Sequence, residues 1–129
     1  MERRSVGSGT TWEKLAGYAR AVRIGNRILV SGTTATGTNG ETVGVGDVGA
    51  QTEFILQKIE TAVSQLGGTM NDIVRTRIYL RNVDDWEPAA RVHGQWFGDI
   101  LPANTLVEAN LVGDDYLVEI EAEAIVNEE

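Results

Sequence analysis

The sequence contains no cysteine and only one histidine, His93. Without cysteine the chain can form no disulfide, offers no thiolate nucleophile and cannot build a Cys-based zinc site. One histidine also excludes a metal site with several histidine ligands from a single chain. The sequence therefore predicts neither a disulfide framework nor a metal centre.

Long apolar runs are missing as well. No stretch approaches the ~18 consecutive apolar residues that a membrane-spanning helix needs. The amino end also lacks the apolar region of a signal peptide. We therefore expect a protein with no membrane partner that works in the cytoplasm.

Positive charge is scarce, since 11 Lys and Arg stand against 19 Asp and Glu and give a formal net charge of −8. Non-specific binding to nucleic acid depends on cations that neutralise phosphates. Nucleic acid is therefore not expected as a partner, although a local basic site remains open. The 129 residues have the length of one domain, which we place at 1–129.

The first third of the chain is rich in glycine and in short strand patterns. Residues 1–17 are polar and poorly patterned, and they predict an extended arm or edge. Residues 18–24 and 27–31 predict two strands, joined by a hairpin at Gly25-Asn26 because both residues tolerate positive φ. Residues 36–46, rich in Gly, Thr and Asn, predict a loop.

Two helices are predicted in the remainder. The first begins near Asp47, a favourable N-cap, and ends at Gly67-Gly68, which can take the left-handed conformation. Its apolar stripe has three- and four-residue spacing and consists of Val48, Phe54, Ile55, Ile59, Ala62, Val63 and Leu66. Asp84 or Asp85 caps the second helix, in which Pro88 comes early enough to be tolerated. The apolar side of that helix is bulkier and consists of Trp86, Ala89, Val92, Trp96 and Phe97.

Three further strands complete the pattern. Residues 73–80 alternate, and the predicted core-facing side consists of Val74, Thr76, Ile78 and Leu80. Residues 105–111 and 116–126 predict the last two strands. Strands joined by short turns pair antiparallel, whereas strands separated by a helix can lie parallel. The predicted class is α+β, a mixed β-sheet with two helices packed on one face.

The other face of this sheet carries a mixture of charge and apolar surface. On the last strand it is predicted to hold Leu117, Glu119, Glu121, Glu123 and Ile125, and on residues 73–80 Arg75, Arg77 and Tyr79. Buried carboxylates need cations or hydrogen-bond donors, and Arg75 and Arg77 are the candidates, across strands or across a subunit boundary. Periodicity alone favours the simpler alternative, a solvated face with weakly paired charges.

Several short motifs together carry a family resemblance. They lie in the family's order, at close to its spacing, over residues 18–126, and they are Val30-Ser31-Gly32, Ala50-Gln51-Thr52, Gly67-Gly68-Thr69 with Asp72-Ile73-Val74, Arg77-Ile78-Tyr79-Leu80, Pro102-Ala103 and Val118-Glu119-Ile120-Glu121-Ala122. With these motifs the chain resembles the Rid family, the reactive intermediate deaminases, also called YjgF-like proteins. The resemblance implies a chorismate-mutase-like fold and a homotrimer, in which three sheets form a central barrel and small ligands bind in clefts between subunits.

The resemblance also implies a chemistry. Active members hydrolyse enamines and imines such as 2-aminoacrylate to keto acids and ammonia, with no cofactor. Glu119 matches a glutamate thought to orient or activate water, and Tyr18, Ser31 and Gly32 match residues that border the family's cleft. Each of these residues also has a purely structural interpretation: a paired strand-face charge for Glu119, an amphipathic edge for Tyr18, and a strand end with a turn for Ser31 and Gly32.

Asn104 departs from the family pattern. The best-characterised branch has an arginine after Pro-Ala that binds the substrate carboxylate through two hydrogen bonds, and an amide brings neither the charge nor that fork. Our hypothesis is that Arg77 takes over anion binding, and Arg20 is a weaker candidate.

Three functions therefore compete at this point. The first is a cofactor-independent enamine or imine hydrolase with an altered substrate preference, and the second is a trimeric metabolite-binding protein without turnover. Endoribonuclease activity, a name attached to some family members, is the weakest because the chain is acidic. His93 is more typical of a surface or packing residue than of a base, and Trp12, Trp86 and Trp96 are more typical of core or interface than of a ligand site.

Overall fold

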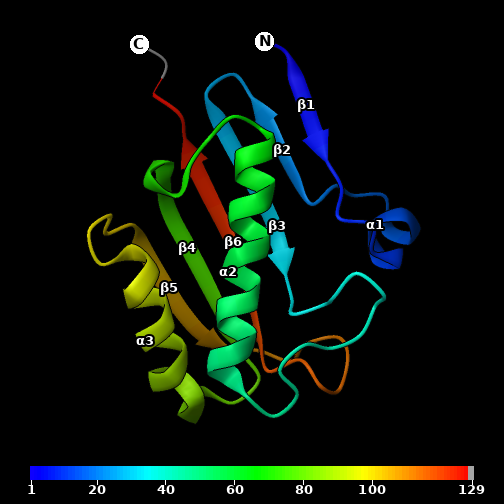
Figure 1. The fold of residues 1–129 in the computed structure, drawn as a ribbon, viewed down its shortest axis with the longest axis vertical. Helices are drawn as coiled ribbons and strands as arrows, with labels where there is room; N and C mark the ends of the chain where they lie inside the picture. The colour runs from blue at the N-terminus through cyan, green and yellow to red at the C-terminus, as the bar shows by residue number, and fades with distance from the viewer. Residues whose placement is uncertain (128–129) are drawn as a thin grey trace.

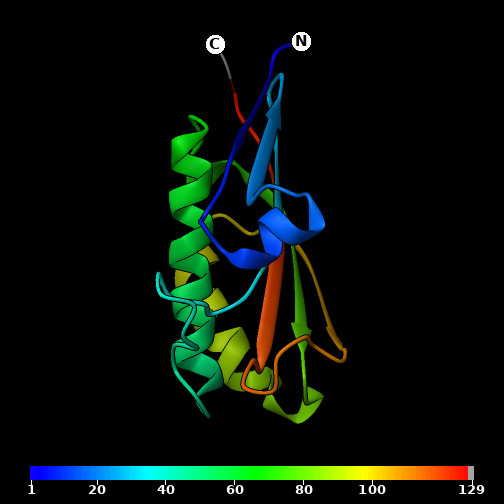
Figure 2. The ribbon, with the colours of Figure 1, turned by 90° about the vertical axis from the view of Figure 1, so that its right-hand side faces the viewer.

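The computed structural model describes residues 1–127 as a six-stranded mixed sheet with its long helices against one face (Figures 1 and 2). The strands lie in the order β1-β2-β3-β6-β4-β5. They are β1 (Arg3–Val6), β2 (Ala21–Ile24), β3 (Arg27–Thr33), β4 (Ile73–Leu80), β5 (Ala103–Glu108) and β6 (Val118–Ile125). The helices are α1 (Thr11–Ala16), α2 (Val48–Gln65) and α3 (Trp86–Phe97), with 3-10 turns at Met70–Asp72 and Val83–Asp85. The predicted α+β class, with two helices on one face of a mixed sheet, is confirmed.

The first half of the sheet follows the predicted hairpin. Strands β2 and β3 pair antiparallel from Ile24 opposite Arg27 onward, and Gly25 has φ 59°. Residues 3–6 form the predicted edge, since β1 pairs only with β2 in the described part of the chain. The sequence did not predict α1, a helix of six residues. It lies to one side of the sheet (Figure 1).

Helix α2 has the predicted ends. At its start the Asp47 carboxylate accepts a hydrogen bond from the Ala50 N–H at 3.0 Å. At its end Gly67 has φ 86°, and the Gly68 N–H donates to the Val63 carbonyl at 2.9 Å, so the two glycines close a Schellman turn. Within residues 1–127 no helix combines the length and the apolar character needed to cross a membrane.

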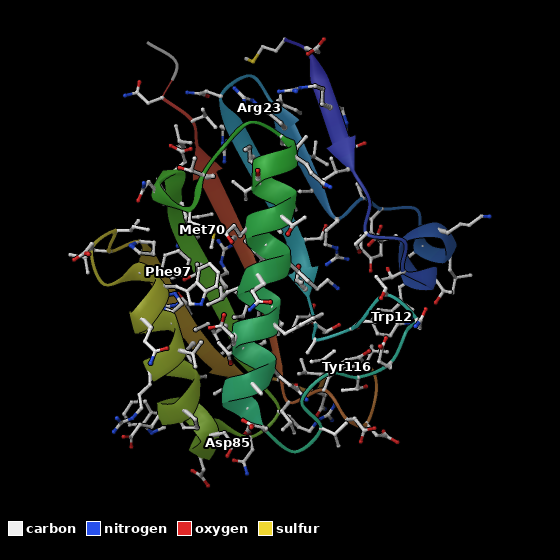
Figure 3. The ribbon with its side chains drawn as sticks, viewed as in Figure 1. Trp12, Arg23, Met70, Asp85, Phe97 and Tyr116 are labelled. Carbon is white, nitrogen blue, oxygen red and sulfur yellow. The ribbon has the colours of Figure 1, made fainter. Side chains whose placement is uncertain are left out.

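The core lies between these helices and the sheet. Ile55, Ile59 and Val63 of α2 are fully buried, as are Ile28, Ile78 and Ile120 of the sheet. The Phe97 side chain of α3 points into this core (Figure 3). The indole N–H of Trp96, also in α3, donates a hydrogen bond to Glu53 of α2 at 2.8 Å. Trp86, predicted on the apolar side, is instead 53% exposed, because it is the first residue of α3 and lies beyond the packed turns.

Strand β4 corrects one predicted orientation. Thr76, Ile78 and Leu80 are buried as expected, but Val74 is 41% exposed and Ile73 takes the core position. The register with β6 shifts between Ile73 and Arg75, so a bulge reverses the alternation at the start of the strand. Beyond the bulge β4 pairs antiparallel with β6 and parallel with β5.

The face of the sheet opposite the helices has the predicted mixed character. On β6, Val118, Ile120, Ala122 and Ala124 are buried toward the helices, while the three glutamates point the other way and are half-buried. Arg77 pairs with Glu121 at 3.6 Å and with Glu123 at 3.3 Å, so the arginine predicted to meet these carboxylates does so within one chain. Leu29 and Ile125 are about half exposed on the same face.

The N-cap of α2 gives a direct test of helix stabilisation. Asp47→Ala removes the acceptor for the Ala50 N–H and should lower the free energy of unfolding by about 0.5–2 kcal/mol. Asp47→Asn keeps a side-chain oxygen and should recover most of that loss. Urea denaturation of the three proteins measures the effect, and equal losses in both variants would contradict the capping role.

Candidate functional site

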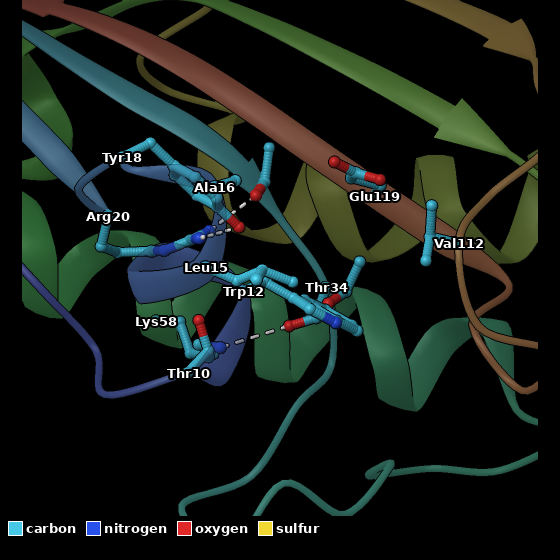
Figure 4. Close-up of a pocket in the computed structure, with 11 residues that line it drawn as sticks. Thr10, Trp12, Leu15, Ala16, Tyr18, Arg20, Thr34, Lys58, Val112 and Glu119 are labelled. Carbon is cyan, nitrogen blue, oxygen red and sulfur yellow. Dashed lines mark hydrogen bonds between the residues drawn. The ribbon is translucent and has the colours of Figure 1, made fainter.

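A cavity of about 280 Å³ opens beside the end of β3, where α1, α2 and β6 converge (Figure 4). Its polar groups come from distant parts of the chain: Tyr18, Arg20, Gly32, Thr34, Lys58 and Glu119. Apolar wall is supplied by Trp12 and Leu15 of α1 and by Val112 of the loop before β6. The cavity therefore joins charged groups to apolar surface, which is typical of sites for small organic ligands.

Glu119 reaches the cavity because β3 makes room for it. The register between β3 and β6 shifts between Val30 and Thr33, so Gly32 lies within an irregular part of β3. A Cβ atom built on Gly32 would lie 2.0 Å from Glu119 Oε2. With a larger residue at position 32 the Glu119 carboxylate would have to move from this position.

The environment of Glu119 favours its protonated form. Burial raises the pKa of this carboxyl above its usual value, Glu121 adds to the effect, and the positive charge of Arg20 opposes it. A carboxyl whose pKa is raised in this way can hold a proton closer to neutral pH and exchange it with a ligand.

Arg20 is the cation beside Glu119, and its own position is fixed by buried partners. It is 4% exposed and donates to the Gly32 carbonyl at 2.6 Å and to Thr33 Oγ1 at 2.9 Å. Its Nε lies 3.3 Å from the Glu13 carboxylate of α1. Burial alone would raise the pKa of Glu13, but hydrogen bonds from Ser8 and Thr10 and the charge of Arg20 lower it overall, so Glu13 stays ionised as the partner of Arg20.

Lys58 is a second cation at the cavity. It extends from α2 and donates to the Thr36 carbonyl at 3.1 Å and, at 3.5 Å, to that of Thr34. Burial, with a contribution from the charge of Arg20, lowers the pKa of Lys58 to about 8, although Glu13 acts in the opposite direction. The sequence did not predict a role for Lys58 because no motif contains this residue. Its spacing could have placed it on the packed face of the helix, since Lys58 lies four residues from both Phe54 and Ala62 of the apolar stripe.

Three of the predicted site residues meet in this cavity: Tyr18, Gly32 and Glu119. Ser31 lies next to it with a structural contact, because its hydroxyl donates to the Ala19 carbonyl at 2.7 Å. Trp12, predicted to lie in the core or at an interface, lies in the cavity wall. Its ring makes an edge-to-face contact with Tyr116, with 5.7 Å between the ring centroids (Figure 3).

Arg77 and Asn104 are not brought to Glu119 within one chain. Arg77 is engaged with Glu121 and Glu123 on the uncovered face. Asn104 is on edge strand β5 and faces the helix side, where its amide donates to Thr76 Oγ1 at 2.9 Å. In the described chain, Arg20 is therefore better placed than Arg77 to meet an anion near Glu119.

His93 belongs to the same cluster as Asn104. Its Nε2 lies 2.8 Å from Thr76 Oγ1, and its ring packs against Phe97 at 4.6 Å between centroids. Burial lowers its pKa, which favours the neutral ring. These contacts agree with the packing role expected for this histidine.

Sequence comparison defines the class of protein to which this fold and cavity belong. Residues 10–126 match the family described as Endoribonuclease L-PSP, and the chain belongs to this family, whose members are also called YjgF or Rid proteins. The chain is 35% identical over 112 residues to the 3-aminoacrylate deaminase RutC of Acinetobacter baylyi. The aligned region covers 87% of this chain and 89% of that protein.

Solved structures give the same result. The fold is similar to that of Rv2704 from Mycobacterium tuberculosis, described as a member of the YjgF/YER057c/UK114 family, with a TM-score of 0.88 and 44% identity over 97% of this chain and 100% of that one. A Yersinia pestis protein described as a member of the conserved Rid family matches with a TM-score of 0.85 and 25% identity, over 97% of this chain and 100% of that one. The resemblance seen in the sequence motifs is thus confirmed.

The raised pKa of Glu119 predicts a specific dependence of stability on pH. Between the usual pKa of 4.5 and the raised native value, the folded state binds more protons than the unfolded state, so this group's contribution to stability falls as pH rises through that interval. Glu119→Gln removes the titration. The melting temperature of the variant should therefore rise relative to wild type between pH 4 and pH 7, as measured by calorimetry in matched buffers. A difference that does not change with pH would contradict the burial of an ionisable Glu119.

Proposed function

We propose that this protein is a cofactor-independent hydrolase that converts small enamines or imines to carbonyl compounds and ammonia. The observation that carries the proposal is Glu119, a carboxyl with a raised pKa at a cavity that also holds the fixed cation Arg20. The similarity to a 3-aminoacrylate deaminase supports the same reaction class. The proposed setting is the cytoplasm.

The reaction requires proton transfers that one carboxyl group can perform in turn. An enamine accepts a proton on carbon and becomes an iminium ion, water adds to the C=N carbon, and the C–N bond breaks as ammonia leaves and the C=O bond forms. In its protonated state Glu119 supplies the first proton, and as a carboxylate it takes a proton from the attacking water. Arg20 lies on the same cavity and is suited to hold a carboxylate of the substrate.

The substrate preference is proposed to differ from that of the best-characterised branch. There an arginine after Pro-Ala grips the substrate carboxylate, whereas here Asn104 is hydrogen-bonded to Thr76 on the other face of the sheet. Loss of a bidentate hydrogen bond between arginine and the substrate carboxylate costs a few kcal/mol of binding free energy, which corresponds to about a 100-fold loss of affinity. Arg77 remains a candidate only for a cleft completed by another copy of the chain.

A homotrimer is part of the proposal. The uncovered face of the sheet presents Leu29 and Ile125, each nearly half exposed, around the charges of β6 and Arg77. Three such faces packed together would remove this apolar surface from water and would place the cavities at subunit boundaries. Strand β5 is a free edge of the sheet in the described chain, so Asn104 would lie near such a boundary.

The alternative function is a trimeric metabolite-binding protein with no turnover, which needs the same cavity but not the proton chemistry of Glu119. Endoribonuclease activity, which the family description mentions, remains the weakest candidate. The net charge of −8 opposes the approach of a polyanion, and the cations at the cavity are buried or half-buried.

Ammonia release from imines generated in situ from several amino acids distinguishes these functions. If Glu119 is the proton-transfer group, Glu119→Gln and Glu119→Ala should each lower the turnover number by about 10²–10⁴-fold. The matched control is Glu123→Gln, on the same strand and face but outside the cavity, and it should retain wild-type turnover. Equal activity of wild type and Glu119→Gln would overturn the proposed catalytic role.

Two further variants locate the anion site, one through the binding of keto acids and the other through ammonia release. Arg77→Ala should leave binding of keto acids unchanged if Arg20 is the cation, and should weaken it if a second copy brings Arg77 into the cleft. Activity that emerges only in Asn104→Arg would instead indicate that turnover depends on the missing arginine, and would favour the binding protein for the natural chain.

The assembly is tested separately by light scattering coupled to size-exclusion chromatography. We expect a mass three times the 14.0 kDa of one chain. A monomer at micromolar concentration would contradict the trimer and, with it, any cleft shared between subunits.

A further inference from the structure

Lys58 is one of two lysines in the chain, and the two have very different surroundings. Lys14 is exposed on α1. Lys58 is half-buried and extends from α2 to the cavity that also holds Glu119 and Arg20, as Figure 4 shows. The proposed hydrolysis uses Glu119 and Arg20 and leaves Lys58 without a chemical role.

The contacts of Lys58 leave its amine available for chemistry. Its Nζ donates to the carbonyls of Thr36 and, weakly, Thr34, and among residues 1–127 it makes no ion pair with a carboxylate. Partial burial disfavours the ammonium form of Lys58, although the charge of Glu13 acts in the opposite direction. Such a lysine is typical of amines that form imines with carbonyl compounds.

We propose that Lys58 is a nucleophilic amine that binds small aldehydes, ketones or keto acids in this cavity as a covalent imine. The amine nitrogen attacks the carbonyl carbon to give a carbinolamine. The C–O bond then breaks and the oxygen leaves as water, which carries both protons lost by the amine, while the C=N bond forms. Addition of water reverses the sequence, so neither an oxidant nor a reductant is needed.

Glu119 and Arg20 suit the other requirements of this chemistry. Loss of water from the carbinolamine needs an acid that protonates the departing hydroxyl, and Glu119 is a carboxyl group of raised pKa on the same cavity. Arg20 offers a positive charge for the carboxylate of a keto acid. At about 280 Å³ the cavity is at the lower limit of ordinary ligand sites, which suits a compound of a few heavy atoms.

The protonation state of Lys58 gives the expected size of the effect. With the pKa lowered to about 8, mainly by burial and also by the charge of Arg20, about half of the amine is unprotonated at pH 8. A lysine with the usual pKa of about 10.4 is roughly 0.4% unprotonated at that pH. Partial burial of Lys58 slows the approach of reagents and offsets part of this advantage.

The structural alternative is a tether. The two hydrogen bonds from Lys58 fasten residues 34–36 to α2, and this role needs only a long cationic donor. Arginine can supply such a donor but cannot form an imine, so Lys58→Arg separates the two roles.

Reductive trapping tests the inference. The full-length protein is incubated at pH 8 with pyruvate and sodium cyanoborohydride, and the adduct is quantified by intact mass and located by peptide mapping. Lys58 should carry at least about tenfold more adduct than Lys14, given the difference in unprotonated fraction. Labelling at Lys58 should saturate with pyruvate, and Lys14→Arg should not change it.

The Lys58→Arg variant should lose the specific adduct while it keeps the wild-type melting temperature. Equal labelling of the two lysines, labelling of Lys14 or the amino terminus alone, or no adduct at all would each overturn the inference. The proposed hydrolysis is tested independently of this inference. Trapping at Lys58 without ammonia release would reject the hydrolase. Ammonia release without trapping would reject only the covalent amine.

Discussion

The cavity depends on one buried ion pair, between Arg20, the residue before β2, and Glu13 of α1. Helix α1 has only six residues, too few to be stable on its own, so tertiary contacts must hold it in place. Glu13 accepts hydrogen bonds from Ser8 and Thr10 as well as Arg20, and it thereby ties the segment before α1 to the sheet. Arg20 in turn bonds Gly32 and Thr33. Removing either charge would leave the other buried without its partner, and the wall that carries Trp12 and Leu15 would lose its anchor.

The same ion pair links the electrostatics of the cavity to its shape. Arg20 lowers the pKa of Lys58 and opposes the rise of the pKa of Glu119, so its charge acts on both titrating groups. Glu13, which stays ionised, acts on Lys58 in the opposite direction. Gly32 provides the remaining element, because it admits the Glu119 carboxylate next to the carbonyl that Arg20 holds. Geometry and charge at this site are therefore set by the same few contacts.

Local patterns in the sequence were sufficient for most of the fold, because caps, turns and alternation are decided by near neighbours. Asp47, Gly25 and Gly67 have the roles predicted for them. Errors occurred where a distant contact overrides the pattern. The bulge beside Arg75 exposes Val74, and the ion pair of Glu13 stabilises a helix in a segment with little pattern of its own. Lys58 was missed for the same reason, since its environment comes from residues 34–36 and from Arg20, far from it in sequence.

The departure at Asn104 acquires a physical interpretation from its neighbours. The Asn104 amide donates to Thr76 Oγ1, and the same hydroxyl forms a hydrogen bond with His93 Nε2. Partial burial lowers the pKa of His93 and favours its neutral ring. The three side chains thus form a hydrogen-bonded series from edge strand β5 through β4 to α3. An amide used in this way contributes to the framework, and it carries no positive charge to offer an anion. The positive charge that a small anionic substrate requires must then come from elsewhere, and within one chain the cations at the cavity are Arg20 and Lys58.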